Sequence, residues 1–218
     1  EEIQDLIPGI EDKVSLIYNF VDLNQINFLS KEKVDHPWFQ EDFTTPVILS
    51  AGRLSVQKNY TLLINAFSNV LKTRDLRLII LGEGEKRQEI EELIFKLGIQ
   101  DKVSLPGFKQ NPFSWMARAE IFALSSDFEG CPNVLLQALG CGCKVIASDS
   151  ESGPREILER GKWGRLFKVG DVEDLSNKIL SSLQQDKDID PKERAKYFSN
   201  ERCLGKYREL FIENKELA

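Results

Sequence analysis

The chain has 218 residues, of which 41% are hydrophobic and 29% charged, a composition typical of globular proteins rather than of disordered or fibrous ones. Its 29 Lys and Arg residues and 35 Asp and Glu residues give a formal charge of −6 at pH 7, which argues against a protein that tracks nucleic acid. No apolar run approaches the roughly 20 residues of a membrane-spanning helix, and the acidic first residues are unlike a signal peptide. Because the chain does not begin with Met, we expect a processed chain or a piece of a longer protein.

Residues 1–45 differ in pattern from the rest of the chain. Residues 14–18 (Val-Ser-Leu-Ile-Tyr) are typical of a single strand, and a long irregular connection is expected to follow them. His36 lies in that connection without a second residue for metal or triad chemistry, so we expect a surface or packing role for it. This layout favours the end of a preceding lobe or an interdomain linker over residues 1–45.

Residues 46–186 alternate short β-branched runs with amphipathic helical stretches, and glycine or proline ends several of them. Strands that recur with helices between them imply right-handed crossovers and a parallel sheet covered on both faces. The order therefore predicts a doubly wound, Rossmann-like α/β domain. The expected strands are 47–51, 76–81, 103–105, 119–124 and 144–147, and the expected helices are 60–71, one ending at Gly98, and one from Pro132 to about Gly140.

Residues 187–218 are expected to begin with a break at 187–191 and to continue as helix from Lys192 to Asn214. That stretch is a charged helix with an apolar stripe of Tyr207, Leu210 and Phe211, and we expect the stripe to pack against another part of the protein. The four cysteines lack the spacing of a zinc site, and we expect reduced thiols packed as small apolar side chains: Cys131, Cys141, Cys143 and Cys203.

Ligands of open parallel sheets bind at the carboxyl ends of the strands. In the loop after the first strand, Gly52 allows close approach to the backbone and Arg53 and Lys58 supply two cations, as diphosphate binding requires. The alternative for this loop is a turn with solvated charges. Gly82 either lets a base or ribose lie against the backbone or makes a turn, since no third glycine completes a dinucleotide fingerprint.

A second such loop joins the fourth strand to the helix that Pro132 opens. Gly130 and the proline-started helix would aim unpaired backbone N–H groups at the mouth of the sheet, which makes an anion site. Glu129 could hydrogen-bond ligand hydroxyls beside that anion, or it could serve only as a charge at the helix N-terminus. Both interpretations of this loop stay open on the residues alone.

Six segments, in order, together resemble the carboxyl-terminal, donor-binding half of the family 4 retaining glycosyltransferases, which have the two-lobed GT-B fold. They are Ile17-Tyr18-Asn19-Phe20-Val21-Asp22, Gly52-Arg53-Leu54 with Lys58, Gly82-Glu83-Gly84, Val103-Ser104-Leu105-Pro106-Gly107-Phe108, Glu129-Gly130-Cys131-Pro132 and Gly142-Cys143-Lys144-Val145-Ile146-Ala147-Ser148. The resemblance covers nearly the whole chain, and its implied acceptor-binding lobe, well over 100 residues upstream, is not in this sequence. The final helix resembles the segment that crosses back onto that lobe.

The resemblance assigns a role to each matching residue. Arg53 and Lys58 would clamp the nucleotide diphosphate and stabilise the leaving group as its charge develops. Glu129, the first acid of an E-x7-E element, would bind hydroxyls of the donor sugar. Phe108 and Lys109 would flank the base. The remaining donor contacts it implies are Gly52, Gly82, Gly130 and the amides of Asn133, Val134 and Leu135.

One position departs from the family pattern, because the second acid of that element is Gln137 here. An amide offers one acceptor and two donors where a carboxylate accepts two hydrogen bonds from ribose hydroxyls. We therefore expect altered ribose binding, weakened by about 1 kcal/mol, rather than its loss. The departure keeps an alternative open, namely a degenerate, non-catalytic nucleotide- or glycan-binding module.

The resemblance implies a metal-independent enzyme without cofactor that transfers a hexosyl or N-acetylhexosaminyl residue from a nucleotide sugar to a glycan or lipid-linked acceptor. UDP is favoured by the likeness of Ser152-Gly153-Pro154 to polysaccharide-building members. The fragment alone should bind donor but transfer little. We expect no nucleic-acid partner and a cytoplasmic location, with the inner face of the membrane as a site of peripheral association for the full-length protein. A nicotinamide-dependent oxidoreductase would need a glycine fingerprint that is missing here.

Overall fold

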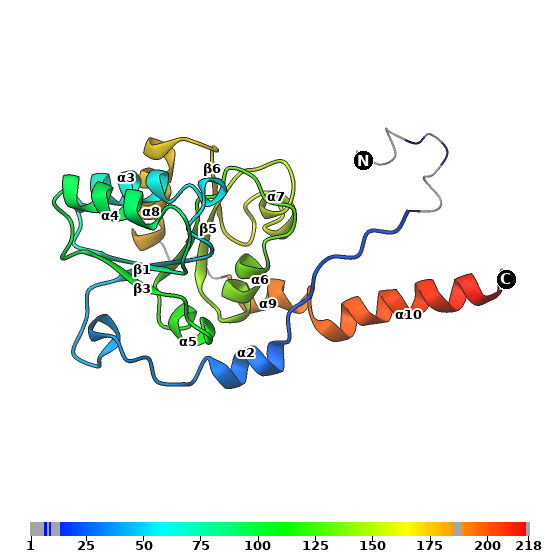
Figure 1. The fold of residues 1–218 in the computed structure, drawn as a ribbon. Helices are drawn as coiled ribbons and strands as arrows, with labels where there is room; N and C mark the ends of the chain where they lie inside the picture. Colours follow the sequence, from blue (N-terminus) through cyan, green and yellow to red (C-terminus); the bar gives the residue numbers. More distant parts are fainter. Residues whose placement is uncertain (1–6, 8, 10–13, 185–188, 217–218) are drawn as a thin grey trace.

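The computed structural model describes residues 7, 9, 14–184 and 189–216, and its centre is a six-stranded sheet (Figure 1). Every neighbouring pair of strands is parallel, and the order is β3-β2-β1-β4-β5-β6. The chain reverses direction across the sheet between β1 and β4, so the predicted doubly wound α/β fold is confirmed. The strands are β1 (Val47–Ala51), β2 (Arg77–Leu81), β3 (Val103–Gly107), β4 (Ile121–Leu124), β5 (Lys144–Ser148) and β6 (Arg165–Phe167).

Helices cover both faces of the sheet because successive strand residues point to opposite sides. In β1, Ile48 packs in the cluster of buried residues on one face, and Val47 and Leu49 pack in the cluster on the other. The first face carries α3 (Tyr60–Leu71), α4 (Arg87–Lys96) and α8 (Val172–Gln184). The second carries α2 (Leu23–Leu29), α5 (Phe113–Met116), α6 (Asn133–Gly140), α7 (Pro154–Ile157) and α9 (Pro191–Lys196).

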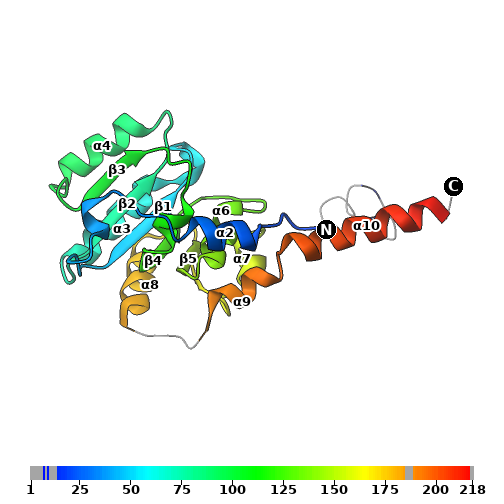
Figure 2. The same ribbon diagram turned by 90° about the horizontal axis from the view of Figure 1, so that it is seen from below.

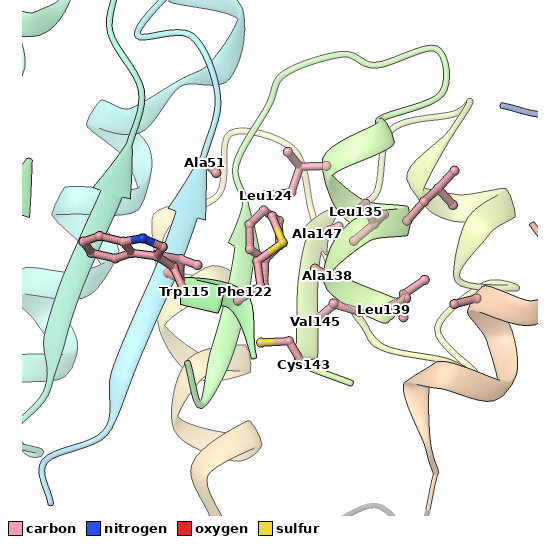
Figure 3. Packing of buried hydrophobic residues seen from close by; sticks show 14 of the residues in the cluster. Ala51, Trp115, Phe122, Leu124, Leu135, Ala138, Leu139, Cys143, Val145 and Ala147 are labelled. Carbon is pink, nitrogen blue, oxygen red and sulfur yellow. The ribbon is translucent and has the colours of Figure 1, made fainter. Parts of the chain in front are cut away.

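The second face fixes the position of α6. Leu135 and Leu139 of this helix are fully buried against Phe122 of β4 and Val145 of β5, in the cluster that Figure 3 draws. A buried side chain of this size contributes about 1.5–3 kcal/mol when it leaves water. The packing therefore anchors α6 on the sheet and holds its N-terminus at the carboxyl end of the strands.

The segment before the sheet differs from its prediction in two places. The strand expected over residues 14–18 is wrong: Leu16 is 65% exposed, and the segment has no neighbouring strand within the described part of the chain. A helix, α2, occupies part of the segment that was expected to be irregular. It begins after Asp22, whose side chain accepts a hydrogen bond from the Gln25 amide at 2.9 Å, and it buries Ile26 against the domain.

The C-terminal stretch is broken where one helix was expected. Here α9 ends at Lys196 and α10 runs from Asn200 to Glu216, because Phe198 is buried and its carbonyl oxygen accepts from the Val21 amide at 2.9 Å. Four strands also differ at one end from their predictions. β2 begins at Arg77 and β4 only at Ile121, whereas β3 extends to Gly107 and β5 to Ser148. The break expected at 187–191 lies partly outside the described residues.

Helix α10 projects away from the domain, on the same side as residues 14–20 (Figures 1 and 2). Tyr207 and Phe211 of its apolar stripe are 40% and 67% exposed. Leu210, the third member of the stripe, is half-buried and lines a shallow hollow with Ser15, Leu16 and Ile17. No helix within residues 14–184 or 189–216 combines the length and apolar content that crossing a bilayer demands.

Candidate functional site

A cavity of about 670 Å³ opens at the carboxyl end of the sheet, beside the place where the strand order reverses. Loops after four strands and the first turns of α6 surround it. Ten of the predicted site residues line it: Gly52, Arg53, Lys58, Gly82, Phe108, Lys109, Glu129, Asn133, Val134 and Gln137. The topology thus brings together residues up to 85 positions apart in sequence, from Gly52 to Gln137.

Backbone forms the floor of the cavity at the ends of β1 and β2. Gly82 has φ of 133°, and a Cβ atom there would lie 1.9 Å from the carbonyl oxygen of Gly52. The Gly52 amide donates to the Leu81 carbonyl at 2.9 Å, which holds the two strand ends together. Only glycine permits this contact, so a ligand meets bare backbone here.

Hydrogen bonds join the loop that carries Lys58 to the loop that carries Glu129. The Ser125 hydroxyl donates to the Lys58 carbonyl at 2.8 Å, and the Asp127 amide donates to the Gln57 carbonyl at 2.9 Å. Asn59, in the left-handed conformation at φ of 43°, caps α3 and donates from Nδ2 to Asp127 at 2.7 Å. These bonds fix both loops before any ligand arrives.

Lys58 and Glu129 form an ion pair inside the cavity. Lys58 Nζ lies 2.5 Å from Glu129 Oε1, and the Ser126 hydroxyl donates to the same oxygen at 2.7 Å. The two side chains are only 16% and 9% exposed. Solvent therefore screens the attraction between the two side chains weakly, and removing either one would leave the other as an uncompensated, nearly buried charge.

Arg53 is held much more loosely than Lys58. Its Nε lies 3.3 Å from a carboxylate oxygen of Glu85, with side chains 75% and 52% exposed. Surface pairs of this kind contribute little, so Arg53 can turn from Glu85 to a ligand anion at small cost.

The N-terminus of α6 presents unpaired donors to the cavity. No side chain caps this helix, and the amides of Asn133 and Val134 find no acceptor within the described part of the chain. The Leu135 amide donates to the Pro132 carbonyl at 2.9 Å, and its side chain is buried in the core. Leu135 therefore has no amide to offer a ligand, contrary to its predicted role.

Gly130 also differs from its expected position. It adjoins the lining residues Glu129 and Cys131 but does not itself line the cavity. The Gly153 loop packs against it instead, since a Cβ on Gly153 would lie 2.5 Å from the Gly130 carbonyl oxygen. Gly130 thus supports the loop from behind.

Phe108 and Lys109 form the wall after β3. Phe108 is 74% exposed, and Lys109 Nζ lies 5.6 Å from the centre of the Trp115 ring. Gln137, four residues into α6 from Asn133, lies on the same side of the helix and lines the cavity with it. An exposed aromatic ring and an ammonium group suit a flat, polar heterocycle.

The sequence missed Glu83 and Cys131 as lining residues. Glu83 accepts from Arg87 at 2.7 Å, and its place directly after Gly82 at the end of β2 was the available signal. Cys131 follows Gly130 in the loop, and partial burial raises the pKa of its thiol. Neither residue type has a pattern that separates a cavity wall from a solvated loop.

His36 does not line the cavity. His36 Nδ1 accepts from the Trp38 amide at 3.2 Å, and its Nε2 lies 3.1 Å from Ser104 Oγ, which confirms the predicted packing role. Burial, with Lys109 as a second cause, lowers the pKa of His36. All four cysteines are unpaired thiols, and no three His, Cys, Asp or Glu side chains gather as a metal site within the described residues.

Comparison with known families and proteins gives a consistent result. The family model described as glycosyl transferases group 1 matches residues 33–202. The chain is similar to a Campylobacter jejuni protein named N-acetylgalactosamine-N,N'-diacetylbacillosaminyl-diphospho-undecaprenol 4-alpha-N-acetylgalactosaminyltransferase. The two are 38% identical over 188 residues, a region that covers 85% of this chain and 49% of that protein. It is 28% identical to the lipopolysaccharide core biosynthesis glycosyltransferase LpsE of Rhizobium meliloti, over 82% of this chain and 49% of that one.

Solved structures share the fold. The Anabaena protein HepE, in complex with UDP and glucose, superimposes with a TM-score of 0.80 at 23% identity, covering 94% of this chain and 59% of that chain. A glycosyltransferase from Rickettsia africae superimposes with a TM-score of 0.79 at 22% identity, covering 93% and 57%. The chain thus spans about half to three fifths of the length of the proteins it matches.

Proposed function

The chain belongs to the glycosyl transferases of group 1, and from that premise we propose that it is the donor-binding half of a retaining, metal-independent glycosyltransferase. Its fold is that of the carboxyl-terminal domain of GT-B enzymes. The donor in this proposal is a nucleotide sugar, and the residue transferred is a hexosyl or N-acetylhexosaminyl group. Arg53, Lys58 and Glu129 act on the reacting part of that donor.

One observation carries the proposal: two cations and an uncapped helix N-terminus face the same cavity. When a sugar leaves a nucleotide diphosphate, negative charge grows on the phosphate oxygens. Lys58, Arg53 and the N–H groups of Asn133 and Val134 are placed to stabilise that charge. Because these groups supply positive potential from the protein itself, the chemistry needs no divalent cation as a clamp.

Glu129 has a separate part in this proposal. Lys58 and Ser126 both contact its Oε1, which leaves Oε2 for a hydroxyl of the donor sugar. A charge-assisted hydrogen bond of that kind is stronger than a neutral one and fixes the sugar relative to the diphosphate. The ion pair thus holds the Glu129 side chain in place while Lys58 reaches the phosphate.

The comparisons support a UDP-sugar as donor. HepE was crystallised with UDP and glucose, and the Campylobacter jejuni relative is named as an N-acetylgalactosaminyltransferase. Phe108 and Lys109 would flank the base, with Gln137 beside the ribose. The acceptor is a glycan or a lipid-linked sugar, as the name of that relative indicates for its own reaction.

The whole enzyme in this proposal includes an acceptor-binding lobe upstream of this chain. The exposed apolar residues Tyr207 and Phe211 of α10, and Leu16 before α2, would pack against it. The chain alone would bind donor and transfer little or no sugar. Its place in the cell would be the cytoplasm, with the full-length protein at the inner face of the membrane.

Titration calorimetry of the 218-residue chain with UDP, GDP and ADP, without added metal and with EDTA, tests the proposal. We expect UDP to bind, and Arg53→Ala with Lys58→Ala in one variant to abolish the binding while the fold persists. Lys72→Ala with Lys96→Ala, two lysines at the ends of helices that do not line the cavity, is the matched control for lost charge. Absence of binding at millimolar concentration for all three nucleotides contradicts the proposal.

A second candidate function rests on Gln137, which lines the cavity where the family pattern has an acid. In that case the protein is a degenerate module that binds nucleotide or glycan without turnover. Gln137→Glu in the full-length protein separates the two. A gain of transfer from nothing favours the degenerate module, whereas wild-type transfer changed only in KM favours the enzyme.

A further inference from the structure

A hydrogen bond joins the segment before the sheet to the cavity. Asn19 donates from Nδ2 to Oδ1 of Asn133 at 2.9 Å, across 114 positions of sequence. Asn133 is the first residue of α6 and lines the cavity, whereas Asn19 does not line it. The contact is solvent-exposed, so its effect is on the direction of a side chain rather than on the stability of the fold.

The neighbours of Asn19 hold it in place on both sides. The Tyr18 hydroxyl donates to Glu156 of α7 at 2.7 Å. Two positions after Asn19, Val21 forms a parallel β-bridge with Ser199, and its amide donates to the Phe198 carbonyl at 2.9 Å. Asn19 is therefore a fixed donor, anchored between α7 and the start of α10.

The bond decides which end of the Asn133 amide faces a ligand. A carboxamide has an oxygen that accepts and a nitrogen that donates two hydrogen bonds. Asn19 occupies the oxygen of Asn133, and the helix start leaves the Asn133 side chain uninvolved in capping. The nitrogen thus remains for the cavity, where Lys58 and the backbone amides already favour an anion.

We propose that Asn19 is a positioning residue that orients the Asn133 amide, with its nitrogen toward the diphosphate. The inference rests on the proposed function and deepens it. It also means that the segment entering the domain at residues 18–22 and the start of α10 are connected to the anion-binding end of α6 through one side chain. A shift of that segment would break the bond, free the Asn133 amide to rotate and weaken donor binding.

Two substitutions at Asn19 separate orientation from mere contact. Asn19→Ala releases the Asn133 amide, and we expect UDP to bind about threefold to tenfold more weakly. The carboxylate in Asn19→Asp can only accept hydrogen bonds, so it draws the Asn133 nitrogen toward itself and leaves the Asn133 oxygen facing the phosphate. We expect the affinity for UDP to fall more than tenfold. Binding of uridine, which has no phosphate, should stay unchanged in both. Asn69→Asp, an exposed change of the same charge on α3, is the matched control.

An added carboxylate also repels the diphosphate directly, and a double-mutant cycle removes that contribution. In the Asn133→Ala background, Asn19→Asp should cost at most threefold, because no amide is left to turn. Melting temperatures verify that each variant is folded. The inference is overturned if Asn19→Asp binds UDP as tightly as the wild type, or if its penalty is the same with and without Asn133. Failure of the wild-type chain to bind any nucleoside diphosphate would instead overturn the proposed function.

Discussion

Replacing Lys58 by Met should destabilise the fold and abolish donor binding for two separable reasons. Met keeps an apolar stem of similar length but removes the charge, so Glu129, 9% exposed, loses its counter-ion. Breaking a fully buried pair by removing one partner costs about 3–5 kcal/mol. Because the lysine is 16% exposed and Ser126 still donates to Glu129, we expect about 2 kcal/mol here. For a chain of this size that lowers Tm by about 4–8 °C.

A second substitution distinguishes the structural effect from the effect on binding. Lys58→Met together with Glu129→Gln leaves no unpaired charge, so stability should return to within about 1 kcal/mol of the wild type. UDP binding should not return, since the cation is still missing. Denaturant unfolding gives the stabilities, and calorimetry gives the affinities. The reasoning is refuted if the double variant is no more stable than Lys58→Met alone, or if Lys58→Met binds UDP with wild-type affinity.

Three further predictions concern other walls of the cavity. Gly82→Ala should lower the free energy of unfolding by about 3 kcal/mol or more, because its Cβ would overlap the Gly52 carbonyl. As a control, Gly98 has φ of 67° and nothing within 4 Å of an added Cβ, so Gly98→Ala should cost only about 1–2 kcal/mol. Equal losses for the two variants in denaturant unfolding would contradict the contact between Gly82 and Gly52. Gln137→Glu should tighten UDP binding about fivefold in calorimetry by restoring an acceptor for ribose hydroxyls, and weaker binding would exclude that contact. Cys131 should react slowly with iodoacetamide at pH 7.5 and faster as the pH rises past the usual thiol pKa, because burial raises the pKa of its thiol. Saturating UDP should slow the reaction further, because Cys131 lines the cavity. If UDP does not protect Cys131, the ligand binds elsewhere.

The sheet was predictable because most of its strands are short apolar runs, and β1, β2 and β3 end at or beside a glycine. Val47–Ala51 and Tyr60–Leu71 have the predicted bounds, and the order of elements alone implies the doubly wound fold. β6 has three residues, too few for a period-2 pattern to stand out. The apolar residues at 14–18 resemble a strand, but no sheet edge is near them to supply hydrogen bonds.

The candidate site was partly predictable because parallel sheets gather loops at one edge. Arg53, Lys58 and Glu129 could be named from their positions after strands and before a helix. Sequence could not show that Lys58 and Glu129 pair with each other, since 71 positions separate them. The role of Asn19 was hidden for the same reason: its partner is set by how residues 14–22 cross the end of α6, which no local pattern encodes.

A crystal structure of the chain with bound UDP is the most direct test of where the diphosphate sits. We predict phosphate oxygens within hydrogen-bonding distance of Lys58 Nζ and the Val134 amide, with the Arg53 guanidinium turned from Glu85 toward them. A diphosphate bound outside this cavity, or inside it with Lys58 still paired only to Glu129, would contradict the account.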